Sequence, residues 1–138
     1  MRPVVVDASV AAAWLIRSQA SAYADAFRSS SGIRLIAPNI FAWEMCNLLR
    51  LFASRGAFEL DAGLASLDAL GVVLEPAISG QSISELTRFA HGVRLSLFDA
   101  AYLALALEAE AELVSRDGHL LTVALANGIP CHDLRDRS

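Results

Sequence analysis

Four acidic residues that are far apart in the sequence, Asp7, Glu44, Asp99 and Asp117, could act together in one reaction. Asp7 directly follows a β-branched run at residues 4–6, which predicts a buried strand. A buried carboxylate is costly unless it is paired, hydrogen-bonded or bound to a cation. Several acids in one cleft repel one another, and a divalent cation with oxygen ligands, Mg²⁺ or Mn²⁺, relieves that repulsion. Because such a cation activates water and neutralises charge on a phosphodiester, the set indicates metal-dependent hydrolysis.

Three of these acids also have a purely structural interpretation. Asp7 could accept hydrogen bonds from the amides of a following helix, as aspartate does in turns. Asp99 lies three residues after Ser96, the spacing of a capping box in which an acid replaces the usual glutamate or glutamine. Asp117 stands immediately before a predicted helix, where aspartate is a favoured N-cap. Taken one at a time, these three residues therefore do not establish a catalytic site.

Glu44 is harder to explain structurally, because residues 40–49 around it are apolar on nearly every side. Asn47 is three residues further on and shares a helical face with Glu44, and Arg50 and Ser54 continue a narrow polar stripe. Such a stripe either meets solvent or lines a polar cleft, and both interpretations stay open.

The elements that would position these acids alternate along the chain. We expect strands at residues 4–6, 33–36, 72–74, 112–115 and 129–132, and helices at residues 10–16, 20–28, 40–54, 60–70, 82–91, 96–109 and 117–128. This order predicts one α/β domain over residues 1–138, with a mostly parallel sheet of about four to five strands covered by helices on both faces. In such sheets the active site lies beyond the carboxyl ends of the strands, where Asp7 and Asp117 fall.

Individual residues predict where several of these elements begin and end. Ser9 is expected to be the N-cap of the first helix, and Pro38 and Asn39 are expected to precede the helix at residues 40–54. Pro76 is expected to close the third strand, and Gly92 to stop the helix at residues 82–91.

The composition removes several classes of function. The chain of 138 residues has a net charge of −4, and its 11 basic residues are all arginine. The absence of lysine excludes a Walker-type nucleotide site and Schiff-base chemistry. It also argues against a phosphate-transfer domain, such as a response receiver or a haloacid-dehalogenase-like phosphatase. The hydrophobic fraction of 55% and the mean hydropathy of +0.46 favour additional buried surface, such as a homodimer interface or a groove for a partner. A non-catalytic acidic α/β module that only binds a partner is therefore the alternative.

Location follows from the cysteines and the apolar runs. Cys46 and Cys131 form no CxxC motif, so we expect two buried or part-buried thiols in a reducing compartment, with a single disulfide as the alternative. The longest apolar run, residues 100–107, is too short to span a membrane. Asp7 interrupts the N-terminal apolar stretch, and Arg17 follows it, so the start of the chain does not fit a signal peptide. The expected location is the cytoplasm.

Other residues that could bind ligands have simpler interpretations. Trp14 and Trp43 are expected to be core or dimer-interface anchors rather than base-stacking platforms. The three histidines lack metal-ligand spacing and are expected at the surface or at helix caps: His91, His119 and His132. Arg116 is a possible contact for RNA phosphate because it is next to Asp117.

Four segments together resemble the signature blocks of PIN domains, and their order and spacing are similar to those of bacterial VapC-type toxins. They are VVDASV at residues 5–10, EMCN at 44–47, LFDAAYLALA at 97–106 and SRDGHL at 115–120. The resemblance covers essentially the whole chain, and its most specific block is the third. It implies a three-layer PIN-like fold and a Mg²⁺- or Mn²⁺-dependent endoribonuclease, usually homodimeric, that acts on RNA as a toxin silenced by a cognate antitoxin.

The resemblance also implies a role for each site residue. By position, Asp7, Asp99 and Asp117 would bind the metal directly or through water, and Glu44 would complete the acidic pocket and help to position the metal-bound water. Three further residues would support the cluster: Ser9 beside Asp7, Asn47 as an orienting group, and Ser115.

Two positions depart from the family pattern. Phe98 stands where family members often have tyrosine, and Gly118 stands where a longer polar residue is frequent. Neither change removes a carboxylate, so both concern substrate contacts rather than the metal site.

Overall fold

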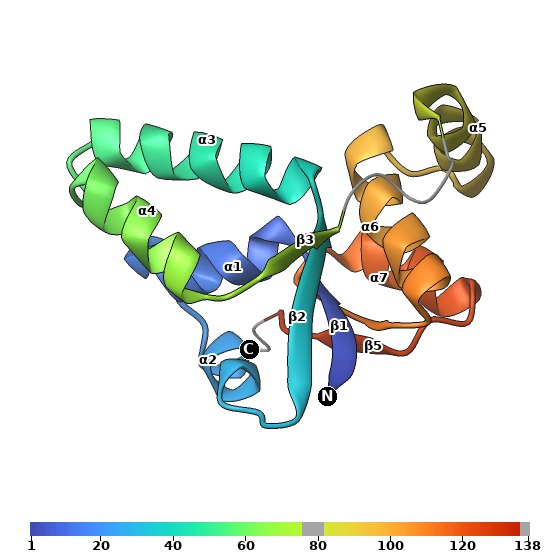
Figure 1. Cartoon of the computed structure of the whole chain (residues 1–138), viewed down its shortest axis with the longest axis horizontal. Coiled ribbons are helices and arrows are strands. Elements are labelled where there is room, and N and C mark those ends of the chain that lie inside the picture. The colour runs from blue at the N-terminus through green and yellow to red at the C-terminus, as the bar shows by residue number, and fades with distance from the viewer. Residues whose placement is uncertain (76–81, 136–138) are drawn as a thin grey trace.

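A computed structural model describes residues 1–75 and 82–135. Within these residues a parallel sheet of five strands runs through the centre of the molecule in the order β3-β2-β1-β4-β5 (Figure 1). Its strands are β1 (Arg2–Val6), β2 (Ile33–Pro38), β3 (Val73–Glu75), β4 (Glu112–Ser115) and β5 (Cys131–Asp133). The predicted α/β fold with a mostly parallel sheet is confirmed, and in the described strands every pairing is parallel.

Helices cover both faces of this sheet. They are α1 (Ala8–Leu15), the short 3₁₀ helix η1 (Arg17–Gln19), α2 (Ala22–Arg28), α3 (Ile40–Ser54), α4 (Leu60–Ala69), α5 (Ile83–Val93), α6 (Leu97–Ala109) and α7 (Gly118–Ala126). Figure 1 shows α1 to α4 on one side of the sheet and α5 to α7 on the other. From β1 the chain adds β2 and β3 toward one edge of the sheet, and it then adds β4 and β5 on the other side of β1. The strand order therefore reverses between β1 and β4, and open α/β sheets bind ligands beyond the carboxyl ends of the strands at such a point.

The sequence explains the rigidity of this region. Val4, Val5 and Val6 of β1 are fully buried, as expected for a central strand covered on both faces. Helix α6 is also buried, since each residue from Ala100 to Ala106 is at most 8% exposed. Residues at the ends of β1 and α6 are therefore held in place by buried elements of the core.

The first helix begins differently from the prediction. Asp7, and not Ser9, is the N-cap of α1, because a side-chain oxygen of Asp7 accepts a hydrogen bond from the backbone N–H of Val10. The helix consequently begins at Ala8, two residues earlier than expected. The Ser9 hydroxyl does not cap the helix and instead donates a hydrogen bond to the Asp7 carboxylate.

The predicted stop at Gly92 is also wrong. Helix α5 continues through Gly92 to Val93 and ends at Arg94, which has the left-handed φ of 61°. The N–H of Leu95 returns to the carbonyl of Ala90 at 3.1 Å, which is the bond that closes a Schellman-type end. Burial of Leu95, which is 8% exposed, sets this ending more strongly than the glycine does. Pro76, the expected end of the third strand, lies outside the described residues.

The predicted burial of the tryptophans and cysteines is met only in part. Trp14 is part-buried and donates from Nε1 to the carbonyl of Ala24, as a core anchor would. Trp43 is 77% exposed and is therefore not a core anchor, and its alternative role as a dimer-interface anchor stays a prediction. Cys46 is exposed, so the prediction of a buried or part-buried thiol is wrong there. Cys46 and the part-buried Cys131 are both free thiols, so the disulfide alternative is not realised. No helix among residues 1–75 and 82–135 is both long and apolar enough to cross a membrane.

Candidate active site

The carboxylate of Asp7 is fixed by three donors at the end of β1. Its Oδ1 accepts from the Ser9 hydroxyl at 2.6 Å and from the N–H of Val10 at 3.2 Å, and its Oδ2 accepts a short bond from the Ser115 hydroxyl. Asp7 is 5% exposed and Ser115 is fully buried. Because every donor comes from a rigid strand end or helix start, the carboxylate has one orientation.

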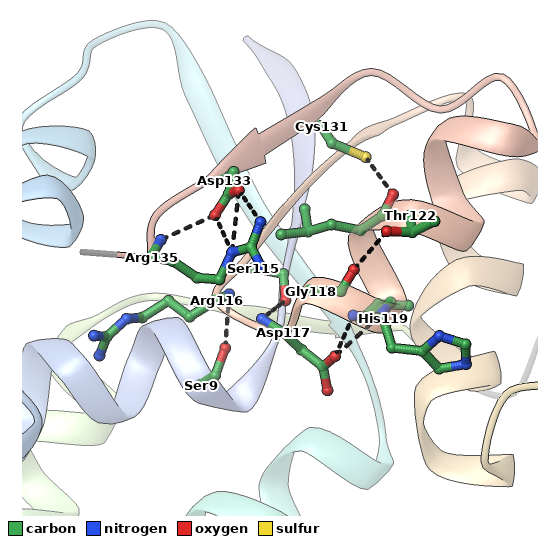
Figure 2. Close-up of polar contacts among 12 residues, drawn as sticks. Ser9, Ser115, Arg116, Asp117, Gly118, His119, Thr122, Cys131, Asp133 and Arg135 are labelled. Carbon is green, nitrogen blue, oxygen red and sulfur yellow. Dashed lines mark hydrogen bonds and ion pairs between the residues drawn. The ribbon is translucent and has the colours of Figure 1, made fainter. Parts of the chain in front are cut away.

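The same two serines connect the ends of the neighbouring strands β1 and β4. The Ser9 hydroxyl accepts from the N–H of Arg116 at 3.0 Å, and the Ser115 hydroxyl accepts from the N–H of Asp117 at 2.9 Å (Figure 2). Each hydroxyl therefore donates to Asp7 and accepts from the turn after β4. This network places Asp117 next to Asp7.

Asp117 is the N-cap of α7, as predicted. Its Oδ1 accepts from the N–H of His119 at 3.0 Å and from the N–H of Leu120 at 3.1 Å. Both bonds use the same oxygen, so capping occupies one side of the carboxylate. The structural and the chemical interpretations of Asp117 are therefore compatible.

Glu44 and Asp99 reach the site from opposite faces of the sheet. Glu44 is half-buried on α3, and its Oε1 accepts from the hydroxyl of Tyr102 at 2.6 Å. Asp99 lies in the first turn of α6, where its N–H donates to the Ser96 hydroxyl at 3.1 Å, so that the predicted helix cap is present.

Charge repulsion links all four acids. Burial, and then repulsion from Asp117, raises the pKa of Asp7 to about 6, although its hydrogen bonds act in the opposite direction. Burial and the neighbouring carboxylate of Asp117 raise the pKa of Asp99, and burial together with Asp99 raises the pKa of Glu44. Asp7 and Asp99 thus each respond to the charge of Asp117, and Glu44 responds to that of Asp99. That the four acids form one catalytic site stays a prediction.

The donor set suits a hard cation, but it does not form a closed cage. Among residues 1–75 and 82–135 no three His, Cys, Asp or Glu side chains lie close enough to hold an ion by themselves. Mg²⁺ in proteins usually keeps several waters and is bound by only one or two carboxylates and the substrate. Carboxylates whose pKa values are raised by burial and by a neighbouring acid fit an ion of that kind.

Comparison with protein families is decisive. The model of the PIN domain matches residues 4–125. The chain belongs to the PIN-domain family. PIN domains are generally nucleases and typically use a divalent metal ion. The matched range contains all four acids.

Solved structures show the same fold. The structure of PAE2754 from Pyrobaculum aerophilum is 22% identical, with a TM-score of 0.66 over 94% of this chain and 83% of that one. VapBC-1 from nontypeable Haemophilus influenzae is 12% identical, with a TM-score of 0.64 over 96% of this chain and 98% of the other. FitAcB from Neisseria gonorrhoeae is 16% identical, with a TM-score of 0.59 over 94% and 96% of the two chains. No curated protein sequence matches this PIN domain.

The remaining predicted residues lie around the PIN site. Asn47 is exposed, and its Oδ1 accepts from the guanidinium of Arg50 at 3.5 Å, so its role in orienting the acids stays a prediction. Together with Trp43 and Cys46 these two residues line an open groove of about 400 Å³ beside Glu44. The guanidinium of Arg116 donates to the carbonyl of Gln19 at 2.9 Å. Its expected contact with RNA phosphate therefore stays a prediction.

One departure from the family pattern lies beside an exposed arginine. A Cβ at Gly118 would meet the guanidinium of Arg135, which donates to both oxygens of Asp133 (Figure 2). Since this guanidinium is the end of a flexible side chain that is 54% exposed, a larger residue at position 118 would only require Arg135 to move aside.

Tyr102 is the site residue that the sequence reasoning missed. It is 2% exposed, and its ring lies within the core of α6. A hydroxyl three residues after Asp99, inside an otherwise apolar run, was the available signal, because that spacing puts both side chains on one helical face.

Proposed function

We propose that this PIN domain is a Mg²⁺- or Mn²⁺-dependent endoribonuclease that hydrolyses RNA phosphodiester bonds. The observation that carries the proposal is the hydrogen-bond network at the carboxyl ends of β1 and β4, in which Ser9 and Ser115 donate to the buried Asp7 and accept from the turn that holds Asp117. Glu44 on α3 and Asp99 on α6 add two more carboxylates, whose pKa values are raised by burial and by a neighbouring acid. A fold that buries such a cluster pays a cost in stability that a bound cation offsets. The nuclease character of PIN domains supports the class of reaction.

The residues divide the work according to their surroundings. Asp7, Asp99 and Asp117 would hold the cation directly or through its water. Ser9 and Ser115 fix Asp7 so that it does not have to reorganise during the reaction. The raised pKa of Glu44 suits it to take a proton from water near the cluster. When bound, the cation supplies a nucleophilic water and neutralises charge on the phosphate.

We also propose that the chain is the toxin component of a toxin–antitoxin pair, with a cognate antitoxin and a second copy of itself as partners. The fold shared with VapBC-1 and FitAcB supports this assignment. Exposed apolar side chains support protein partners, among them Trp43 at 77% and Phe98 at 54%. Light scattering of the purified chain and co-purification with the product of a neighbouring short reading frame test the two partners separately.

RNA cleavage is the direct test of the proposed reaction. The purified chain is incubated with a fluorogenic single-stranded RNA of mixed sequence in Mg²⁺, in Mn²⁺ and in EDTA, and with the corresponding DNA. We expect cleavage of RNA in either metal and none in EDTA. Asp7→Asn and Asp99→Asn should lose activity, whereas Asp68→Asn, an exposed aspartate on α4, should keep it.

Two results would contradict the proposal. Cleavage by Asp7→Asn and Asp99→Asn at the parental rate would remove the carboxylates from the mechanism. Absence of both nuclease activity and metal binding in calorimetry would favour the non-catalytic binding module.

If the chain cleaves RNA, sequencing of RNA ends after induced expression would identify its substrate.

A further inference from the structure

The buried tyrosine on α6 lies where the acids meet. Its hydroxyl donates to Oε1 of Glu44 at 2.6 Å, and its ring is held by the core. Glu44 and Asp99 both act electrostatically on this hydroxyl, and so does Asp7. Tyr102 therefore contacts one of the four acids directly and lies three residues from a second, Asp99, on the same face of α6.

We propose that Tyr102 is a positioning residue for the nuclease reaction, because its hydroxyl holds Oε1 of Glu44 and so fixes the orientation of that carboxylate. The other oxygen, Oε2, is then the one offered to a cation or to its water. This inference rests on the proposed function, since it assigns a role within the same site.

Glu44 needs an external support more than the other acids do. Asp7 and Asp117 are short side chains fixed by backbone amides of their own turns. Glu44 lies in the middle of α3, and its longer side chain has three rotatable bonds. The bond from Tyr102 gives it a fixed partner, which is how outer-shell groups orient the ligands in metal sites.

The placement of Tyr102 also connects two parts of the fold. Helix α3 packs mainly on α4 and α1, whereas α6 packs on α5 and the central strands. Asp99 and Tyr102 are three residues apart on one face of α6. A single rigid helix therefore presents one acid and aligns a second acid that α3 carries.

Tyr102 is suited to donate and not to titrate. Burial and the nearby Glu44 raise its pKa, so the hydroxyl keeps its proton. Substitution by phenylalanine removes that one donor and keeps the buried ring. Tyr23, which is 46% exposed on α2, provides a matched tyrosine-to-phenylalanine control.

The test compares Tyr102→Phe with Tyr23→Phe in RNA cleavage and in binding of Mn²⁺ alone. For Tyr102→Phe we expect kcat to fall about 10- to 100-fold with KM for RNA within about twofold, and the affinity for Mn²⁺ to fall about tenfold. Tyr23→Phe should match the parent in all three. Unchanged kcat and Mn²⁺ affinity in folded Tyr102→Phe, checked by circular dichroism, would overturn the proposal.

Carbon NMR at fixed pH tests the contact without relying on catalysis. All proteins are measured without metal and compared with the parent. In Glu44→Gln the ring signal of Tyr102 should shift, and in Tyr102→Phe the side-chain carboxyl signal of Glu44 should shift. The first measurement is valid even where Tyr102→Phe does not fold, and an unmoved Tyr102 signal would overturn the proposal. If the parent cleaves no RNA, the proposed function fails, while the Mn²⁺ and NMR results still decide whether Tyr102 positions Glu44.

Discussion

Strand β4 begins at Glu112 and is followed by the turn that holds Asp117. The carboxylates at its two ends have different surroundings. At the beginning, Glu112 accepts from His132 at 2.6 Å on one oxygen and from Arg2 at 2.6 Å on the other. The hydrogen bond from His132, together with Arg2, lowers the pKa of Glu112. At the other end, burial and like charge raise the pKa of Asp7 to about 6.

The difference teaches how this fold separates stability from function. A carboxylate that accepts hydrogen bonds from an arginine and a histidine stabilises the native state modestly, and both of its oxygens are already occupied. A buried carboxylate among others destabilises the native state and is poised to bind a cation. Changes at the two ends should therefore have opposite effects on stability and unequal effects on activity.

The largest expected effect is on catalysis at the acidic end. Asp117→Asn should lower the rate of RNA cleavage at least about 100-fold, because it removes a charge from the cluster. Its stability should stay within about 1 kcal/mol of the parent, because asparagine caps helices nearly as well as aspartate. Initial rates and thermal melts measure the two quantities, with Asp25→Asn on the exposed face of α2 as the control. Full activity of Asp117→Asn would leave Asp117 with a capping role alone.

The second effect is a pH dependence of stability caused by Asp7. Its pKa is about 6 in the folded protein, above the ordinary value of 3.8 for an aspartate, so the folded state binds the proton more tightly. The stability that this group contributes is fully present below pH 3.8 and is lost as the pH rises to about 6. The loss amounts to roughly 3 kcal/mol at most. Urea denaturation in EDTA should show that Asp7→Asn lacks this decline, and parallel curves for parent and variant would contradict it.

The third effect is the response of the folded protein to metal. Mn²⁺ at about 100 times its dissociation constant should stabilise the parent by about 2.7 kcal/mol. The gain should be greater at pH 7 than at pH 5, because ligands must lose their protons to bind. Asp7→Asn should lose most of this gain, whereas Glu112→Gln should retain it. Equal stabilisation of all three proteins in thermal melts would place the metal elsewhere.

Local features of the fold and the site were accessible from the sequence. Asp7 and Asp117 follow strand ends, and the rule that parallel strands present their carboxyl ends together was enough to predict that they meet. The caps at Ser96 and Asp117 follow from residue type and position. The caps depend on neighbours within a few residues of the chain, whereas the meeting of Asp7 and Asp117 follows from a general rule of parallel sheets.

Features that depend on tertiary packing were not accessible. The Ser115–Asp7 bond joins residues 108 apart, and the Tyr102–Glu44 bond joins residues 58 apart. Predicting either one requires the rotation of each helix about its axis. The exposure of Trp43 was not predictable for the same reason, because a helix that is apolar on nearly every side does not reveal which side faces outward.

The smallest expected effect concerns the paired end of β4. Glu112→Gln should destabilise the protein by about 1 kcal/mol or less at pH 7, because its partners are part-exposed and screened by solvent. The pKa of Glu112 is lowered from 4.5, so the stability it contributes is present above that pH and is lost as the pH falls through the lower folded value. The difference between parent and variant should therefore vanish in acid, in the direction opposite to the Asp7 effect, and RNA cleavage should be unchanged. A loss as large as that assigned to Asp7, or one that persists in acid, would mean that the two ends of the strand do not differ as their charges indicate.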